Sequence, residues 1–340
     1  MRFGLVYDFR NPAQWRKPWA EVYAGLLDQI AFADELGFDS IWLTEHHFVA
    51  DGYTPSPVPL MAAIAVRTKR VEISTDILIL PLYHPVKLAE DIATVDVLSN
   101  GRVMLGVGSG YRDEEFAAFG TSRKERARRM EEGVAVLRGC WAEGPFSFAG
   151  RHYQLNGIDV VPKPVQRPHP PLWMAATAEP AARRAARLGL HLLPQADRTG
   201  GYDAWVDELG KLGRNPRDYR IGLIKSWFLS DDGRGDPLWE VVREHERYRG
   251  QTYAPWLAAG YVRPGPAAVP IDQGYMIGSA GEIIAQIDAL TTQLPVTDII
   301  GWGTPPGMDA GDFNPRLERF AREVMPHFRS RCRRLTVPPR

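Results

Sequence analysis

Cysteine is nearly absent from this sequence of 340 residues, which contains only Cys140 and Cys332, far apart in the chain. Two widely separated cysteines cannot form a disulfide framework, a zinc knuckle or a CxxC redox site. The composition therefore predicts a protein of a reducing compartment, and we expect a cytoplasmic location.

Long hydrophobic runs are also missing. No window approaches the ~18 uncharged apolar residues of a membrane span, and the first ten residues already include Arg2, Asp8 and Arg10. We therefore expect neither a signal peptide nor a transmembrane helix, and no association with a membrane.

An excess of charge of either sign is absent, because 41 Lys and Arg residues balance 41 Asp and Glu residues. No overall field is available to attract nucleic acid or an anionic surface, and the basic ending RSRCRRL is interpreted as a solvated helix end. The 44% hydrophobic content is enough for a large core. We favour one domain over residues 1–340 rather than two smaller ones.

Apolar strand-like segments alternate with helical segments along the chain. Strands are predicted at residues 2–7, 39–43, 71–80, 103–107, 172–177, 190–193, 220–229 and 296–302. Helices are predicted at 19–36, 60–67, 86–98, 122–141, 179–188, 202–212, 237–258, 283–290 and 317–328. Few of the strands alternate with period two, which indicates that both faces are buried. This pattern predicts an α/β fold, a closed (β/α)₈ TIM barrel, with an open doubly wound sheet as the alternative.

The chain is longer than the ~250 residues of a bare barrel. We assign the surplus to a hairpin near 146–156 and to an insertion at 237–275. The part from 248 to 275 carries Tyr248, Tyr253, Trp256, Tyr261 and Tyr275, together with prolines and glycines that do not sustain a helix. It is predicted to be a long surface loop that acts as a mobile lid over the barrel mouth. Packing on the barrel flank or a dimer contact is the alternative.

The segment IWLTEHHF places Glu45, His46 and His47 directly after a predicted strand. A free imidazole titrates near pKa ~6.5, so histidines beside a carboxylate suit proton transfer near neutral pH. One solvated and one packed histidine is the alternative. A metal site is disfavoured, because adjacent side chains diverge and no HxH or HExxH spacing is present.

The segment GVGSGY contains Gly106, Gly108 and Gly110, but it is not a dinucleotide fingerprint, because Tyr111 stands where a glycine is needed. Glycines at a strand end still allow a flat ring or a phosphate to approach the backbone, and crowding at the barrel rim is the alternative. The pair Thr75 and Asp76 interrupts an apolar strand. These two polar side chains either form hydrogen bonds within the protein or face the barrel mouth and a ligand.

Several segments in this order resemble the bacterial luciferase-like flavin-dependent monooxygenase family over nearly the whole chain. They are LGFDSIWLTEHHF, ISTDILILPLYHPVKLAEDIATVDVLSNGRVMLGVGSGY, PKPVQRPHPPLWMAAT and the ending TDIIGWGTPPGM. The resemblance implies a (β/α)₈ barrel, often dimeric, that binds FMN at its C-terminal mouth. It also implies that reduced flavin and O₂ oxygenate an organic substrate.

The resemblance assigns roles to individual positions. His46 matches the family's catalytic histidine, with Glu45 and His47 as neighbours, and 76–77 falls where many members have a non-proline cis peptide under the flavin. The positions implied to bind the cofactor are Thr75, Asp76, Gly106, Gly108, Ser109, Gly110, Tyr111, Ala175, Ala176 and Thr177. Ala178 stands where the family commonly uses a serine for the phosphate. Phosphate binding is therefore left to Ser109, Thr177 and the amides that begin helix 179–188.

The leading hypothesis is an FMN-dependent monooxygenase that acts on a small-molecule substrate as a homodimer. A separate flavin reductase is expected to supply the reduced FMN, since the chain has no fingerprint for NAD(P)H. The alternatives are a dehydrogenase or reductase that uses the deazaflavin coenzyme, and a non-catalytic flavin-binding subunit. The presence of His46 beside Glu45 speaks against the last of these. No motif in 237–275 identifies the substrate.

Overall fold

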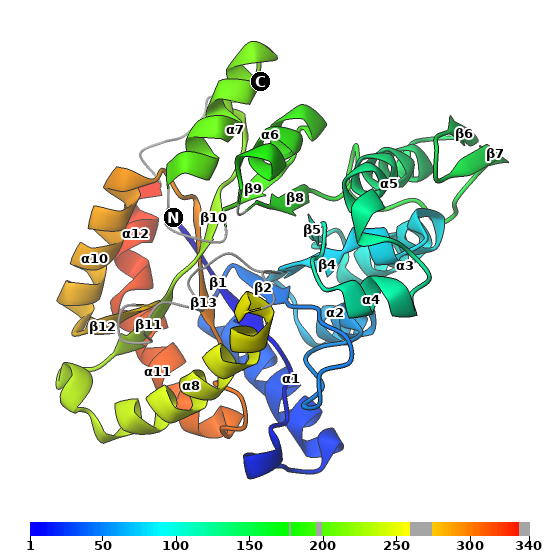
Figure 1. The fold of residues 1–340 in the computed structure, drawn as a ribbon. Helices are drawn as coiled ribbons and strands as arrows, with labels where there is room; N and C mark the ends of the chain where they lie inside the picture. Colours follow the sequence, from blue (N-terminus) through cyan, green and yellow to red (C-terminus); the bar gives the residue numbers. More distant parts are fainter. Residues whose placement is uncertain (177, 195–198, 259–273, 333–340) are drawn as a thin grey trace.

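The computed structural model describes residues 1–176, 178–194, 199–258 and 274–332 (Figure 1). Figure 1 shows central strands surrounded by helices, with one hairpin that projects from the body. Thr177, part of the loop after residue 194, most of the predicted lid and the chain end lie outside the described residues.

The described strands form a closed parallel ring. Its members are β1 (Arg2–Tyr7), β2 (Ser40–Leu43), β3 (Glu72–Thr75) followed by β4 (Leu78–Ile79), β5 (Leu105–Gly108), β8 (Leu172–Ala175), β9 (His191–Leu193), β10 (Gly222–Ile224) and β13 (Asp298–Trp302). One sheet has the order β10-β13-β1-β2-β3 and the other β4-β5-β8-β9. Parallel bridges from Ile73 to Val103 and from Leu192 to Ile221 join the two sheets at both seams. The predicted barrel is therefore confirmed.

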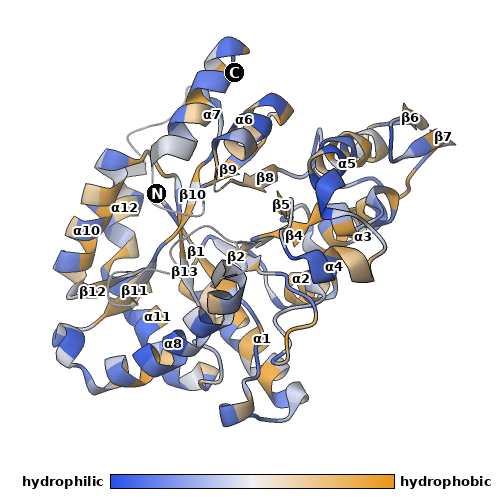
Figure 2. Ribbon diagram, viewed as in Figure 1, coloured by the Kyte–Doolittle hydropathy of each residue, from blue (hydrophilic) through white to orange (hydrophobic). Residues whose placement is uncertain are grey.

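Helices surround this ring. They are α1 (Trp19–Leu36), α2 (Pro57–Arg67), α3 (Pro85–Ser99), α4 (Asp113–Ala118), α5 (Arg126–Trp141), α6 (Glu179–Leu188), α7 (Thr199–Lys211), α8 (Pro237–Ala258), α10 (Ala280–Gln293), α11 (Ala310–Glu323) and α12 (Met325–Cys332). Figure 2 shows α1 and α5 with mixed hydrophobic and hydrophilic residues, as expected for helices with one buried side. No helix in the described part of the chain combines the length and the apolar character needed to cross a membrane.

Two predicted strands differ from the structure. The segment 71–80 is divided into β3 and β4, with a cis peptide between Asp76 and Ile77. The segment 220–229 is divided into β10, which belongs to the barrel, and β11 (Ser226–Leu229), which pairs with the unpredicted strand β12 (Tyr275–Gly278). The chain leaves the barrel here because Trp227 stacks on Phe320 of α11, with ring centroids 4.0 Å apart. The predicted hairpin is confirmed as β6 (Phe146–Ala149) and β7 (Gln154–Ile158).

The barrel interior is filled by side chains and closed at one end. A buried cluster from several strands fills it, made of Val6, Trp42, Met104, Trp173, Leu193 and Ile300. At the N-terminal ends of the strands, Arg220 lies between two carboxylates, 3.1 Å from Asp298 and 3.0 Å from Glu72. The guanidinium also lies over the Trp173 ring, 5.0 Å from its centroid. A ligand of the barrel must therefore bind at the opposite, C-terminal ends of the strands.

His191 at this closed end is expected to make stability depend on pH. Its Nδ1 accepts a hydrogen bond from the Arg220 backbone N–H at 3.0 Å. Burial, assisted by the Arg220 charge, lowers the pKa of His191 from its ordinary 6.5 to about 4. Between these two values the unfolded chain binds a proton that the folded protein does not bind, so stability falls as pH falls.

The free energy of unfolding is expected to fall by about 3 kcal/mol between pH 6.5 and pH 4, because a pKa shift of one unit corresponds to ~1.4 kcal/mol. Urea unfolding of wild type and His191→Asn across this range measures it. The asparagine side chain keeps an acceptor for the Arg220 N–H but does not titrate. The difference in free energy of unfolding between wild type and variant should therefore shrink as pH falls. A difference independent of pH would show that His191 contributes packing only.

Candidate active site

Glu45, His46 and His47 follow β2 at the C-terminal end of the barrel, and their side chains diverge. The Glu45 carboxylate accepts hydrogen bonds from the His47 Nε2 at 2.7 Å, the Ile79 backbone N–H at 2.7 Å and the Tyr83 hydroxyl at 2.8 Å. Glu45 therefore binds His47 and the end of β4, and it is not the partner of His46. The three predicted catalytic residues are brought to one place, but only His46 makes the contacts described next.

His46 is held by groups from beyond β5. Its Nδ1 lies 3.0 Å from Glu115 Oε1, and its Nε2 lies 3.0 Å from the Tyr111 hydroxyl. Burial would raise the pKa of Glu115, but hydrogen bonds from His46 and the His47 backbone and the charge of Arg112 outweigh it and lower this pKa below its usual value. The carboxylate is therefore charged and accepts the proton on Nδ1. When the ring carries a single proton, on Nδ1, its Nε2 accepts a hydrogen bond from the Tyr111 hydroxyl.

Glu115 is the main residue that the sequence reasoning missed. It lies on α4, 69 positions after His46, and is fully buried. Arg112 donates to Glu115 at 3.0 Å and to the His47 carbonyl at 2.7 Å, which joins the two loops. The available signal was the charged segment RDEEF, which follows the glycine cluster at the end of a barrel strand. Buried charges at such a strand end are expected to serve a site.

Aromatic rings cover His46, so only 8% of the residue is exposed. The centroid of its ring lies 4.9 Å from that of Tyr53, 4.7 Å from that of Trp256 and 6.3 Å from that of Tyr253. Trp256 and Tyr253 belong to α8, so the predicted helix at 237–258 is confirmed and the overlapping expectation of a surface loop is wrong for 248–258. Residues 259–273 of the predicted lid lie outside the described residues, and the lid role stays a prediction.

Buried ion pairs fix α8 at the barrel mouth. Arg249 donates to Asp8 at 2.6 Å and to Glu246 at 3.0 Å, and its guanidinium stacks 3.6 Å from the Trp302 ring centroid. These contacts connect α8 to the C-terminal ends of β1 and β13. Aromatic side chains are thereby positioned over His46 by a regular element.

Close packing between strands accounts for the first glycines of GVGSGY. A Cβ atom at Gly106 would lie 1.9 Å from the Thr75 carbonyl oxygen, and one at Gly108 would lie 2.3 Å from Ile77 Cδ1. The Thr75 hydroxyl donates to the Gly106 carbonyl at 2.6 Å and is fully buried. The structure thus gives these three residues a packing role. Their contact with a cofactor stays a prediction.

The remaining predicted cofactor positions surround the mouth. Ser109, Gly110 and Tyr111 lie in the partly exposed loop after β5, and the cis peptide at Asp76 precedes β4. Ala175 ends β8, and Ala176 follows it. Partly exposed apolar side chains cap the interior cluster at these strand ends, namely Ile77, Ala175, Ile224 and Trp302. An apolar surface of this kind fits one face of a flat ring. Thr177 lies outside the described residues.

A basic group lies where α5 and α6 begin, and α6 starts four residues after Ala175 of this surface. Glu131 lies 2.9 Å from Arg184 and Arg138 lies 2.7 Å from the Leu188 carbonyl, so the two helices run side by side in the same direction. Their N-termini therefore meet, and both the Arg123 and Arg184 charges act on Arg126.

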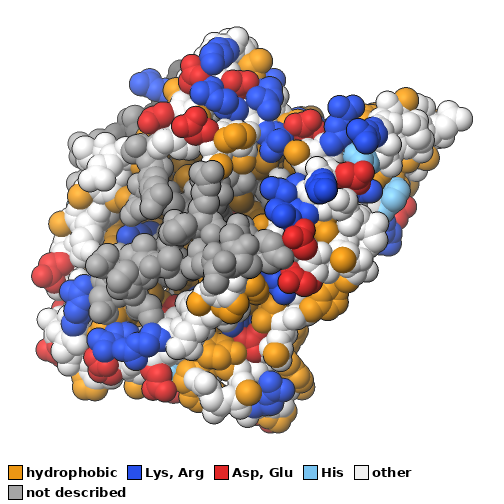
Figure 3. Space-filling model, viewed as in Figure 1, with side chains coloured by type: hydrophobic (Ala, Val, Ile, Leu, Met, Phe, Trp, Pro, Cys, Tyr) orange, Lys and Arg blue, Asp and Glu red, His pale blue; other side chains and the backbone are white. Residues whose placement is uncertain are grey.

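Arg126 forms no ion pair with any described residue and donates to the Arg123 carbonyl at 3.0 Å. Figure 3 shows basic side chains gathered on this face between α6 and α5. The Asp113 charge acts on this guanidinium without forming an ion pair with it. A guanidinium that lies beside two helix N-termini and has no ion pair among the described residues fits a phosphate.

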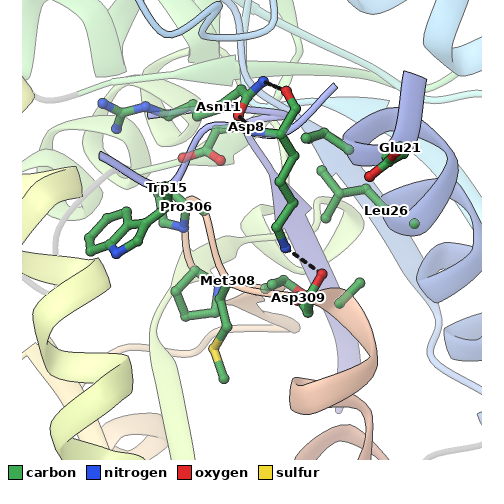
Figure 4. A pocket seen from close by; sticks show the side chains of 16 residues that line it. Asp8, Asn11, Trp15, Glu21, Leu26, Pro306, Met308 and Asp309 are labelled. Carbon is green, nitrogen blue, oxygen red and sulfur yellow. Dashed lines mark hydrogen bonds and ion pairs between the residues drawn. The ribbon is translucent and has the colours of Figure 1, made fainter. Parts of the chain in front are cut away.

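A small cavity lies away from His46, between the end of β1, α1 and the loop after β13 (Figure 4). The Asn11 side chain exchanges hydrogen bonds with the Lys17 backbone, and Lys17 pairs with Asp309 across the opening. Its volume of about 80 Å³ is far below the ~300 to 1,000 Å³ of ligand pockets, so it cannot hold a flavin. Within the described ranges no group of three His, Cys, Asp or Glu side chains could hold a metal ion.

Comparison with known proteins agrees with this geometry. Residues 1–295 match the family model described as luciferase-like monooxygenase, which is most of the chain. The chain belongs to this family. The luciferase-like fold and the family inferred from EHHF and LPLYHPV are thereby confirmed.

Individual relatives of this luciferase-like protein differ in cofactor. It is 32% identical over 228 residues to an FMNH(2)-dependent dimethylsulfone monooxygenase of Pseudomonas putida, covering 65% of the chain and 61% of that protein. It is 36% identical over 191 residues to an F420-dependent glucose-6-phosphate dehydrogenase of Amycolatopsis mediterranei, covering 54% and 56%. The crystal structure of monooxygenase RslO1 from Streptomyces bottropensis superposes with a TM-score of 0.82 at 27% identity, over 96% of this chain and 100% of that one. The matches span between 49% and 63% of the curated relatives' own lengths.

Proposed function

We propose that this luciferase-like protein is an FMN-dependent monooxygenase that receives reduced FMN from a separate flavin reductase and oxygenates a small organic molecule. The observation that carries the proposal is His46, held between Glu115 and Tyr111 beside an apolar surface at the barrel mouth. Bound reduced flavin would supply the electrons for dioxygen activation. The protein's own residues would position the ring, exclude water and move a proton at His46.

The same surface suggests how FMN is held. Ile77, Ala175 and Trp302 would contact the flavin ring, and Arg126 with the first amides of α6 would bind the phosphate. Arg126 would compensate for Ala178, which has no side-chain oxygen at the N-cap of α6.

A deazaflavin-dependent dehydrogenase is the second candidate, supported by the F420-dependent relative at 36% identity. Both coenzymes carry a flat ring and a phosphate, so the apolar surface and Arg126 suit either. Our choice of FMN rests on the segments EHHF and LPLYHPV and on the similarity to RslO1. The FMNH(2)-dependent relative supports the supply of reduced flavin by a reductase.

Binding measurements test this proposal. Reduced FMN is expected to bind more tightly than the reduced deazaflavin coenzyme in anaerobic titrations. Arg126→Gln should weaken FMN binding by about 10- to 100-fold, the value of losing one or two charge-assisted hydrogen bonds. It should leave riboflavin binding unchanged, because riboflavin has no phosphate. Micromolar binding of the deazaflavin, with none of FMN, would overturn the choice of cofactor.

Arg128→Gln is the matched control for Arg126. Arg128 lies on the same helix but is mostly exposed and pairs with Glu132 at 3.0 Å. We expect it to change FMN binding by less than about twofold, since exposed pairs contribute little. An equal effect of both substitutions would point to a general loss of positive charge and would contradict a specific phosphate contact.

A further inference from the structure

We propose that Tyr111 is the residue through which His46 exchanges a proton with a ligand in the barrel mouth. The proposal rests on the proposed flavin function, but it concerns which atom of the protein meets the ligand. In this arrangement Tyr111 is a catalytic residue, and His46 acts behind it.

The hydrogen bonds of His46 lead to this assignment. Both ring nitrogens are occupied by protein groups, Nδ1 by Glu115 and Nε2 by Tyr111, each at 3.0 Å. Tyr53 and Trp256 pack against the ring, and only 8% of the residue is exposed. A proton that leaves or reaches Nε2 must therefore pass through the Tyr111 hydroxyl.

Tyr111 has the chemistry and the position that a relay requires. A phenol hydroxyl has one proton to donate and lone pairs that accept, so it can pass on one proton while it takes another. Burial, together with Tyr253 and Glu115, raises the pKa of Tyr111 well above 10, so the phenol remains protonated at neutral pH. Tyr111 lies in the partly exposed loop after β5, at the rim of the mouth.

The step balances without any additional reagent. An acidic O–H or N–H of the ligand breaks, and its proton goes to Tyr111 Oη. The original Tyr111 proton goes to His46 Nε2 at the same time, which gives an imidazolium ion paired with the Glu115 carboxylate. The reverse movement returns a proton to the ligand and restores neutral His46. Nothing is oxidised or reduced in this exchange, and Tyr111 ends as it began.

The kinetic test uses single-turnover oxidation of bound reduced FMN by dioxygen, followed by flavin absorbance in H₂O and D₂O. Tyr111→Phe is expected to slow the proton-dependent phase by about 10² to 10³-fold and to abolish its solvent isotope effect, with FMN affinity changed by less than about threefold. Combined with His46→Ala it should be no slower than either single variant, because the two residues act in series. Losses that multiply would mean that His46 meets the ligand directly and would overturn the proposal.

Tyr253→Phe separates a relay from disruption of the aromatic cluster. Its hydroxyl bonds to Tyr53 and not to His46, so a loss below about fivefold is expected, within the range of one neutral hydrogen bond. A loss as large as that of Tyr111→Phe would show that the cluster, not the relay, determines the rate. If wild type binds only the reduced deazaflavin, the same variants are compared in hydride transfer from that coenzyme.

Nitrogen NMR of the ligand-free protein gives a readout independent of turnover. With ¹⁵N-labelled histidine, Tyr111→Phe should move the His46 Nε2 resonance toward that of an unbonded acceptor and leave Nδ1 unchanged. Failure of the flavin function would leave this shift in place. An Nε2 resonance identical in wild type and variant would show that the hydrogen bond does not form, and would overturn the proposal whichever cofactor binds.

Discussion

His46→Ala is expected to lower turnover by roughly 10² to 10⁴-fold, the usual contribution of a positioned acid or base. The structure gives the reason, because the charged Glu115 carboxylate fixes the proton on Nδ1 and Tyr111 occupies Nε2. A methyl group in place of the ring removes this path for protons. Flavin affinity should fall much less, since the apolar surface and Arg126 are unchanged. Steady-state oxidation with an added flavin reductase measures the first effect, and anaerobic titration measures the second.

His47→Ala is the neighbouring comparison. His47 bonds to Glu45, and its ring lies against the exposed Phe119, away from Tyr111. Its loss should disturb the loop after β2 and cause a smaller fall in turnover. If His46→Ala retained the wild-type rate while His47→Ala did not, the imidazole assigned to catalysis would be the wrong one.

Arg249→Met is expected to cause the largest loss of stability, about 3 to 5 kcal/mol, the range for removing one partner of a buried ion pair. Arg249 is buried, and its removal takes away the ion-pair partner of both Asp8 and Glu246. Burial already raises the pKa of Asp8, and without Arg249 the fold should favour its protonated form further. The unfolded state then releases a proton that the folded variant retains to higher pH than wild type does, so the destabilisation relative to wild type should be larger at pH 8 than at pH 5.

Urea unfolding at pH 5 and pH 8 measures this loss, with Arg247→Met as the control on the same helix. Arg247 is exposed, so its replacement should change stability by less than about 0.5 kcal/mol. Equal stability of Arg249→Met and wild type would show that α8 does not depend on these ion pairs. Its placement over His46 would then need another cause.

Local patterns were sufficient for much of the fold. The predicted bounds of β1, α1 and α6 agree with the structure because each element has a continuous pattern of apolar residues. Both helices end at a glycine with positive φ, namely Gly37 and Gly189. The segment 220–229 is predicted as one strand because most of its residues are apolar or aromatic. Only the tertiary packing of Trp227 on Phe320 reveals that the chain changes sheets.

Site residues could be predicted only where the evidence for them lies within one continuous segment of the sequence. His46 could be found because the strand and its polar end are contiguous in the sequence. Its partner could not, because adjacency suggested Glu45 whereas the fold brings Glu115 from 69 positions away. Likewise, the helix that carries Trp256 could be predicted, but its position over His46 depends on Arg249, which reaches Asp8 across the barrel mouth.

The most direct test of an oxygenase centred on His46 is to load the protein anaerobically with reduced FMN, mix it with dioxygen and record flavin absorbance over time. We expect wild type to bind reduced FMN and to oxidise it with a rate distinct from that of free FMN, and His46→Ala to bind it while losing the proton-dependent phase. If wild type and His46→Ala followed the same time course as free FMN, the proposed role of the His46 site in flavin chemistry would be contradicted.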